Sequence, residues 1–155
     1  MFYVIILSLC LVVVAQTIII SIRSYGALRA KQVLETDAAI ALERITREVR
    51  DAESVALGGS VLGSHPGVLV LNSTTLDGAP RTVEFLIVNG LLTLKENGVS
   101  VGALTGESAI RTLIFRRIAT ARSEGVKVEL TLQEGVGVAS STESFYATAV
   151  LRDSY

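Results

Sequence analysis

The stretch from Phe2 to Ile22 contains no charged residue, and it constrains the fold more than any other feature of the sequence. At about 1.5 Å per residue, a helix over this stretch would be ~30 Å long, the thickness of the hydrocarbon core of a bilayer. A cleaved signal peptide would have a basic start, a shorter apolar stretch and a small-residue cleavage site. Here the first basic residue is Arg23, and Ser21 to Gly26 contains no Ala-x-Ala-like site. We therefore expect a retained membrane anchor.

The helix-forming pattern continues beyond the apolar stretch. Between Ser24 and Ser54 there is no Pro, and Gly26 is the only Gly, so we expect the helix to continue with a soft point at Gly26. Apolar residues then recur at steps of four and three, which makes one stripe along a helix. The stripe residues, which we expect to pack on a sheet, are Leu34, Ala38, Leu42, Ile45, Val49 and Ala52. The prediction is one helix of about fifty residues, with a transmembrane half over 1–23 and an amphipathic half over 24–55.

Charged side chains cover the remainder of the predicted amphipathic half. We expect them to face solvent and to form stabilising pairs at a spacing of four residues. The predicted pairs are Glu43 with Arg47, Arg44 with Glu48, and Arg47 with Asp51.

From residue 56 onward the pattern is typical of β-strands. Asn89-Gly90 between two apolar runs is the strongest hairpin signal, and Asn97-Gly98 indicates a second turn. Loops are predicted over 58–67, 72–80 and 135–144, where Gly, Pro, Asn, Ser and Thr gather. The predicted strands are 68–71, 81–88, 91–95, 99–101, 109–118, 126–133 and 145–152. The fold class is therefore α+β: a long N-terminal helix, transmembrane then amphipathic, packed on a C-terminal antiparallel β-sheet within 56–155.

Residues that could carry chemistry are few. His65 is the only histidine and Cys10 the only cysteine, and together they cannot supply a common zinc ligand set. There is no Gly-x-Ser-x-Gly elbow and no phosphate-binding loop. We expect His65 to be solvated and Cys10 to be a small packing residue, with no enzyme activity, no cofactor and no small-molecule substrate. The net charge of −1 favours no nucleic-acid partner.

Two smaller motifs are explained most simply by chance occurrence or by exposure to solvent. Asn72-Ser73-Thr74 fits the glycosylation pattern, which arises often by chance. Four arginines lie between residues 111 and 122. We expect them to lie on a solvated face; a binding site for an acidic partner is the alternative. Strand alternation would place two neighbours of this group on opposite faces. The group comprises Arg111, Arg116, Arg117 and Arg122, of which Arg116 and Arg117 are the neighbours.

This arrangement resembles the type IV pilin and type II secretion pseudopilin superfamily. The resemblance rests on the anchor Phe2-Tyr3-Val4-Ile5-Ile6-Leu7-Ser8-Leu9, on the helical run 41–52, and on the β-rich segments 82–85 and 145–152. It implies a minor subunit of a filament that assembles through its N-terminal helix. The residues of the membrane and assembly helix would include Phe2, Tyr3, Ile5, Ile6, Leu9, Val12, Val13, Ile18, Ile19 and Ile22.

The resemblance also implies a location. Arg23, Arg29 and Lys31 follow the span, so the positive-inside rule alone would place the remainder of the chain in the cytoplasm. The resemblance implies the opposite: a single-pass protein of the inner membrane with its globular domain outside the cytoplasm. Its partners would be membrane lipid and other pilin or pseudopilin subunits. A signal-anchored surface binding module that works outside any filament is the alternative.

The superfamily's hallmark is a basic leader, a Gly-Phe cleavage point and a Glu soon afterwards, and none of these occurs within Met1 to Leu11. We therefore expect the natural start to lie upstream of Met1. In-frame translation of the DNA before the Met1 codon should encode a Gly-Phe-Thr-Leu-Ile-Glu-like stretch. A stop codon directly upstream, without that stretch, would contradict the expectation.

Overall fold

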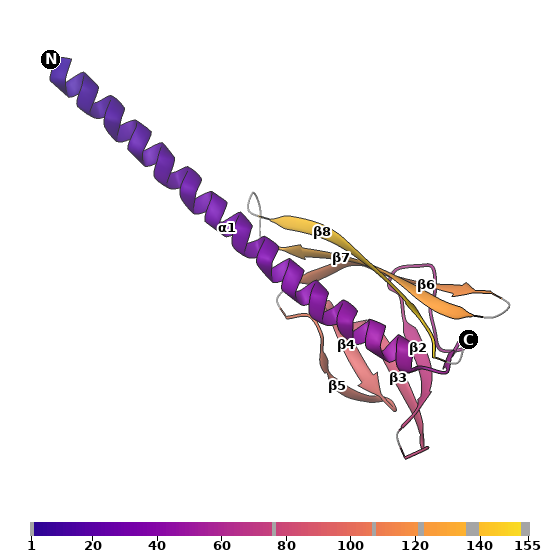
Figure 1. The fold of residues 1–155 in the computed structure, drawn as a ribbon. Coiled ribbons are helices and arrows are strands. Elements are labelled where there is room, and N and C mark those ends of the chain that lie inside the picture. Colours follow the sequence, from indigo (N-terminus) through magenta and orange to yellow (C-terminus); the bar gives the residue numbers. More distant parts are fainter. Residues whose placement is uncertain (1, 76, 107, 121–122, 136–139, 153–155) are drawn as a thin grey trace.

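The protein consists of one long helix followed by two antiparallel sheets, as described by a computed structural model for residues 2–75, 77–106, 108–120, 123–135 and 140–152 (Figure 1). The prediction of an α+β fold with a helix followed by antiparallel strands is confirmed, but the strands form two sheets. The elements are α1 (Phe2–Asp51), β1 (Ser54–Val55), β2 (Leu69–Thr74), β3 (Pro80–Val88), β4 (Leu91–Glu96), β5 (Val99–Ala103), β6 (Ala109–Ala119), β7 (Glu124–Glu134) and β8 (Ser141–Val150).

The helix α1 is a single element of 50 residues, about 75 Å long, as the sequence predicts. It continues through Gly26 without interruption. It ends at Asp51, so the predicted extension to residue 55 is wrong. The physical reason is pairing with the sheet: the Glu53 amide donates to the Asn72 carbonyl at 2.9 Å, and Ser54–Val55 forms the strand β1 beside β2.

The strand order is β1-β2-β3-β4-β5 in the first sheet and β6-β7-β8 in the second. The two predicted hairpin turns are present, since Asn89-Gly90 joins β3 to β4 and Asn97-Gly98 joins β4 to β5. All four turn residues have positive φ, between 50° and 81°. Two consecutive residues with positive φ make a type I′ turn, and this turn matches the twist of the flanking strands.

Two predicted loops are partly strands. The predicted loop 72–80 begins with Asn72–Thr74, which continue β2 and pair with residues 80–82 of β3. The predicted loop 135–144 ends with Ser141–Ser144, which pair with residues 131–134 of β7. Both segments are polar and rich in Ser and Thr, so their composition resembles that of turns. Pairing with a neighbouring strand overrides this local preference.

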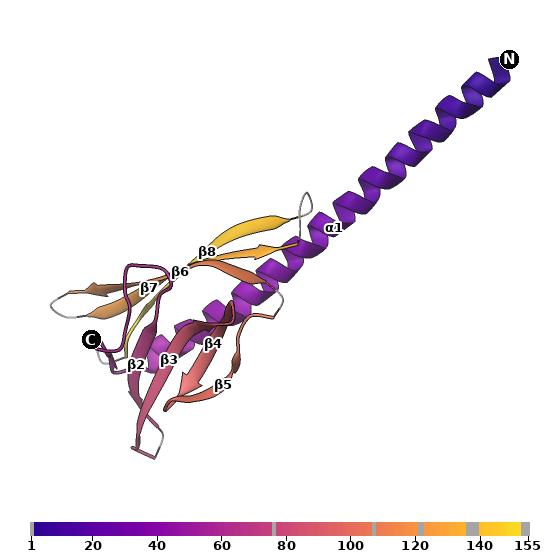
Figure 2. The same ribbon diagram turned by 180° about the vertical axis from the view of Figure 1, so that it is seen from behind.

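One hydrophobic core joins the helix to both sheets. The C-terminal half of α1 lies between β1–β5 on one side and β6–β8 on the other (Figures 1 and 2). Phe85 of β3 and Phe115 of β6 are fully buried in the same cluster as Leu34 and Ile45 of the helix. In β7, the residues from Val126 to Leu132 alternate as predicted between buried apolar and partly exposed polar side chains. The helix therefore serves as the common cover of both sheets.

The loop between β1 and β2 closes the outer edge of β6. The amides of Gly63 and Gly67 donate to the carbonyls of Phe115 and Leu113 at 2.8 and 2.9 Å. The Leu113 amide donates in turn to Nδ1 of His65 at 3.1 Å. The His65 side chain is solvent-exposed, as expected for a loop residue, and it also fastens the loop to the sheet.

Close backbone packing at Gly67 generates a stability prediction. A Cβ atom at this position would lie 2.9 Å from the Leu113 carbonyl oxygen and 3.0 Å from the Phe115 ring. Gly67→Ala should therefore lower the free energy of unfolding by about 1–3 kcal/mol, the usual cost of overpacking. Gly58→Ala is the matched control, because a Cβ at Gly58 meets nothing within 4 Å. Urea unfolding of the full chain in detergent measures both, and equal stability of the two variants would contradict the prediction.

Candidate membrane and assembly helix

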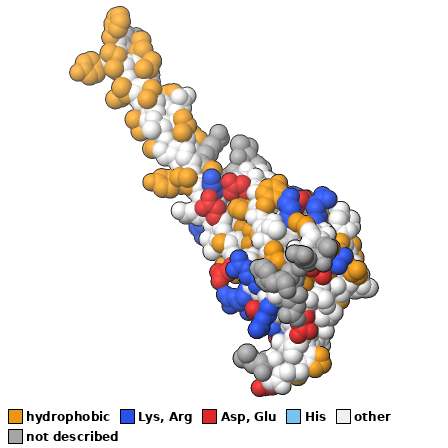
Figure 3. Space-filling view, turned by 45° about the vertical axis from the view of Figure 1, so that its right-hand side comes forward, with side chains coloured by type: hydrophobic (Ala, Val, Ile, Leu, Met, Phe, Trp, Pro, Cys, Tyr) orange, Lys and Arg blue, Asp and Glu red, His pale blue; other side chains and the backbone are white. Residues whose placement is uncertain are grey.

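The first half of α1 projects from the remainder of the chain as a bare rod. All described side chains from Phe2 to Arg29 are exposed, and Ala30 is the first buried residue of the helix. This projecting half is about 40 Å long. Figure 3 shows that hydrophobic side chains dominate its surface, whereas charged side chains gather on the globular part.

The residues predicted for membrane insertion and assembly lie on all sides of this rod. Their exposed fractions run from 50% at Ile19 to 89% at Tyr3. The helix is long and apolar enough to cross a membrane. A helix that is apolar all round is stable in lipid or among similar helices rather than in water. The ten residues are Phe2, Tyr3, Ile5, Ile6, Leu9, Val12, Val13, Ile18, Ile19 and Ile22.

Polar groups within the apolar half differ in how they are satisfied. The hydroxyls of Ser8 and Thr17 donate to the carbonyls of Ile5 and Val13 at 2.9 and 2.8 Å. Such bonds within one helix leave no unpaired donor in lipid. The exposed Gln16 amide makes no side-chain hydrogen bond within the described part of the chain. Gln16 is therefore the polar group of this surface that would gain most from a partner on another helix. Cys10 is a free thiol on the same surface.

The six residues predicted to pack on the sheet lie at the core side of the second half. Leu34, Ala38, Ile45 and Val49 are buried, and Leu42 is partly buried against the same cluster. Ala52 is also buried, just beyond the end of α1.

Two further helix residues, Ala30 and Ala41, are buried and were not predicted. Each lies three or four residues from a stripe residue, so the same periodicity contains them. Because the Ala side chain is small, these two residues add little to the hydrophobic pattern of the sequence.

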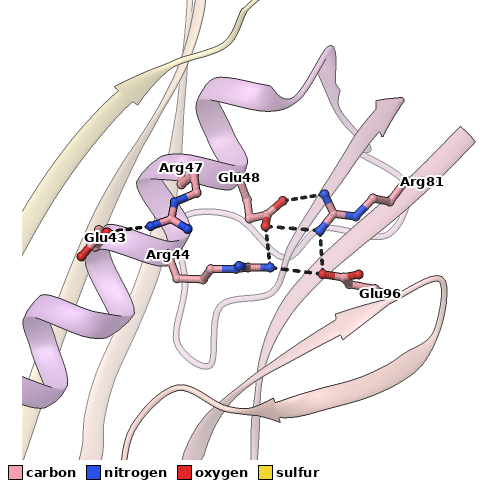
Figure 4. A network of polar contacts seen from close by, with 6 residues as sticks. All are labelled: Glu43, Arg44, Arg47, Glu48, Arg81 and Glu96. Carbon is pink, nitrogen blue, oxygen red and sulfur yellow. Dashed lines mark hydrogen bonds and ion pairs between the residues drawn. The ribbon is translucent and has the colours of Figure 1, made fainter. Parts of the chain in front are cut away.

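A charged network fastens the helix to the first sheet (Figure 4). Glu48 contacts Arg44 at 2.8 Å and Arg81 of β3 at 3.1 Å, while Glu96 of β4 contacts Arg81 at 2.6 Å and Arg44 at 3.2 Å. Burial lowers the pKa of Arg81, but hydrogen bonds from its guanidinium to Glu96 and Glu48 outweigh this effect, so the pKa is raised above its ordinary value. The Arg81 guanidinium therefore remains charged at neutral pH.

The sequence-based interpretation of the charged side chains is correct only in part. Glu43 pairs with Arg47 at 2.7 Å and Arg44 pairs with Glu48, both as predicted. Glu48 does not face solvent, because only 4% of it is exposed. The predicted pair of Arg47 with Asp51 is wrong: among the described residues, the Arg47 guanidinium lies at Glu43 instead.

Asp37 makes a second polar attachment that the sequence pattern did not reveal. One oxygen of its carboxylate, Oδ2, accepts the amides of Gly106 and Ser108 at 3.0 and 3.2 Å. These amides belong to the connection from β5 to β6, where the chain leaves the first sheet for the second. The sequence signal for this contact is the position of Asp37 directly beside the stripe residue Ala38, where an acidic side chain interrupts an otherwise apolar surface.

The arginines of the second sheet are held by neighbouring carboxylates. Arg116 contacts Glu129 at 3.2 Å, and Arg117 contacts Glu124 at 2.6 Å. Lys127 and Arg116 lower the pKa of the Glu129 carboxyl.

Arg116 and Arg117 lie on opposite faces of the sheet, as predicted. Arg116 pairs with Lys127, whose side chain faces outward, and Arg117 pairs with Val126, whose side chain is buried. Arg111 donates to Gln133, and Arg122 lies outside the described residues.

The glycosylation-like motif lies within a paired strand. Asn72, Ser73 and Thr74 are the last three residues of β2, and the Asn72 amide donates to the Ser54 hydroxyl at 3.3 Å. Across the described residues, no three His, Cys, Asp or Glu side chains are grouped so that they could hold a metal ion.

In comparisons with known proteins, the chain matches no protein family, no curated protein and no solved structure. The arrangement itself, a long apolar N-terminal helix packed on antiparallel strands, is a pilin-like layout.

The buried position of Glu48 generates a prediction. Glu48→Gln removes the charge that Arg44 and Arg81 share, so it should lower the free energy of unfolding by about 3 kcal/mol, as breaking a buried ion pair does. The control Glu43→Gln removes an exposed helical pair and should cost less than about 0.5 kcal/mol. Denaturant titration of the full chain in detergent distinguishes the two. A Glu48→Gln variant as stable as the control would show that the network contributes little.

Proposed function

We propose that this chain is a structural subunit, a minor pilin or pseudopilin, of a type IV pilus or a type II secretion-like filament. Before assembly α1 holds the subunit in the inner membrane, with the globular domain outside the cytoplasm. One observation carries the proposal. A rod of about 40 Å, uncharged over Phe2–Ile22, projects from the domain with its described side chains exposed, yet it is continuous with the half that the domain buries.

The surface chemistry of the rod supports both states of such a subunit. Lipid tails and Leu- or Ile-rich helices have similar polarity, so transfer of the rod from a bilayer to a bundle of similar helices costs little hydrophobic free energy. What the bundle adds is van der Waals packing and hydrogen bonds between helices. The Gln16 amide, exposed and without a partner on its own helix, is suited to such a bond.

The attachment of the domain supports the same role. The second half of α1 is held by the common core, by the network around Glu48 and by Asp37. The helix passes from the bare half to the buried half as a single element. A subunit built in this way would transmit the position of its rod in a filament directly to its globular domain.

We infer the location of the globular domain from the pilin-like arrangement and not from the number of basic residues beside the membrane span. Arg29 and Lys31 follow the span, and the positive-inside rule would place them in the cytoplasm. The proposal places them outside, as expected for a subunit whose globular domain joins an extracytoplasmic filament.

Gln16→Leu tests the proposal in cells. The variant should still insert in the membrane, because Leu is more apolar than Gln. The fraction recovered in filaments after shearing should fall by about fivefold, which corresponds to the loss of ~1 kcal/mol from a hydrogen bond between helices. Thr17→Val is the matched control, because the Thr17 hydroxyl is already bonded to the Val13 carbonyl, and its recovery should stay close to that of the wild type.

In the same shearing experiment, the behaviour of the wild-type chain distinguishes a filament subunit from a signal-anchored binding module. Release with sheared filaments supports the filament subunit. Complete retention in membranes, under conditions where filaments are present, would contradict it and favour the signal-anchored binding module.

A further inference from the structure

The two sheets end in edge strands of very different character. Strands β5 and β8 each have one hydrogen-bonded neighbour. Strand β5 has five residues, and its pairing with β4 shifts register between Leu94 and Lys95. Short edge strands with a bulge are poor templates for another strand.

Strand β8 has none of these protective features. Its ten residues pair with β7 without any register shift, from Ser141 with Glu134 to Val150 with Gly125. It contains no Pro, Lys or Arg, and Glu143 is its one charged residue. Within the described part of the chain, no backbone group pairs with its outer edge. A long, regular edge of this kind accepts an additional strand.

A groove runs along this open edge. Residues Thr148 to Leu151 line a cavity of about 510 Å³ together with Arg50 and Arg152. Tyr146 and Ala147 line the neighbouring cavity of about 500 Å³, whose opposite wall is the helix from Leu42 to Asp51. Since consecutive residues of one strand line both cavities, the backbone edge itself is accessible along them.

The charge of the groove indicates what it would bind. Arg50 lines both cavities, is exposed, and has no ion-pair partner among the described residues. Arg152 joins it in the second cavity, where no carboxylate is among the lining residues. Arg47, by contrast, is neutralised by Glu43 at 2.7 Å. Arg50 and Arg152 are the charged residues that line the cavity near Val150, so this end of the groove is suited to a carboxylate, while Asp51 and Glu53 line other cavities beside these arginines.

We propose that the outer edge of β8 binds an extended segment of a partner polypeptide that carries an acidic side chain. The segment adds to β6-β7-β8 as a fourth strand through backbone hydrogen bonds. Its carboxylate lies between Arg50 and Arg152. This site does not depend on the proposed filament function, since the rod of α1 takes no part in it.

Hydrogen–deuterium exchange on the full chain in detergent micelles tests the proposal. The probe is a blocked synthetic peptide, Thr-Val-Glu-Val-Thr-Val, and a second peptide carries Lys in place of Glu. Added acidic peptide should protect alternate amides between Ser141 and Val150, whose N–H groups point away from β7, and leave Val99 to Ala103 unchanged. Arg50→Gln should weaken binding of this peptide about fivefold, the upper range for an exposed ion pair. Arg29→Gln, the same change on the bare half of α1, should have no effect.

Three results would overturn the proposal. The first is an absence of protection in β8 at millimolar peptide. The second is equal protection by the acidic and basic peptides, or equal binding by the Arg50→Gln and Arg29→Gln variants, since the charged end of the groove would then play no part. The third is concentration-dependent protection of β8 in the chain alone, which would assign this edge to a second copy of the chain.

Discussion

The burial of one helical stripe against two sheets is the contact on which the fold depends. A sheet with one apolar face must cover that face, and here a single helix covers both. Leu34, Ile45 and Val49 lie in the same cluster as side chains from β2, β3, β4, β6 and β7. The helix is therefore not an anchor to which a finished domain is attached. Its second half is part of the core, so the domain cannot be separated from the whole of α1 without losing its centre.

Polar contacts determine where along the helix the sheets lie. An apolar stripe with a repeat of three and four residues looks similar after a shift of one turn. The carboxylate of Glu48 meets Arg81 in only one of these positions, and that of Asp37 meets the amides of Gly106 and Ser108 in the same one. These contacts lie on opposite ends of the buried half of α1. They define the register of the helix, while the core supplies most of the stability.

The features that depend on local patterns could be predicted from the sequence, and those that depend on distant partners could not. The continuous helix follows from helix formers without Pro, and the hairpins follow from Asn89-Gly90 and Asn97-Gly98. The burial of Glu48 depends on Arg81, which is 33 residues away.

The division into two sheets likewise depends on Asp37 and on the loop around His65, which contact the chain 48 to 71 residues further on. At the candidate site, the apolar rod is readable from composition alone, whereas the groove beside β8 required the position of Arg50 relative to a strand about a hundred residues later.

The β-rich part begins and ends at the same place. The Arg152 amide donates to the Ala52 carbonyl at 3.3 Å, so the chain leaves the second sheet where it left the helix. Segments whose two ends meet can be exchanged with little disturbance to what carries them. Evolution could therefore replace the strands and loops between these residues as a cassette, provided that each new version kept a surface for the same stripe. In the proposed filament, one rod carried with different heads would give a single assembly many different exteriors.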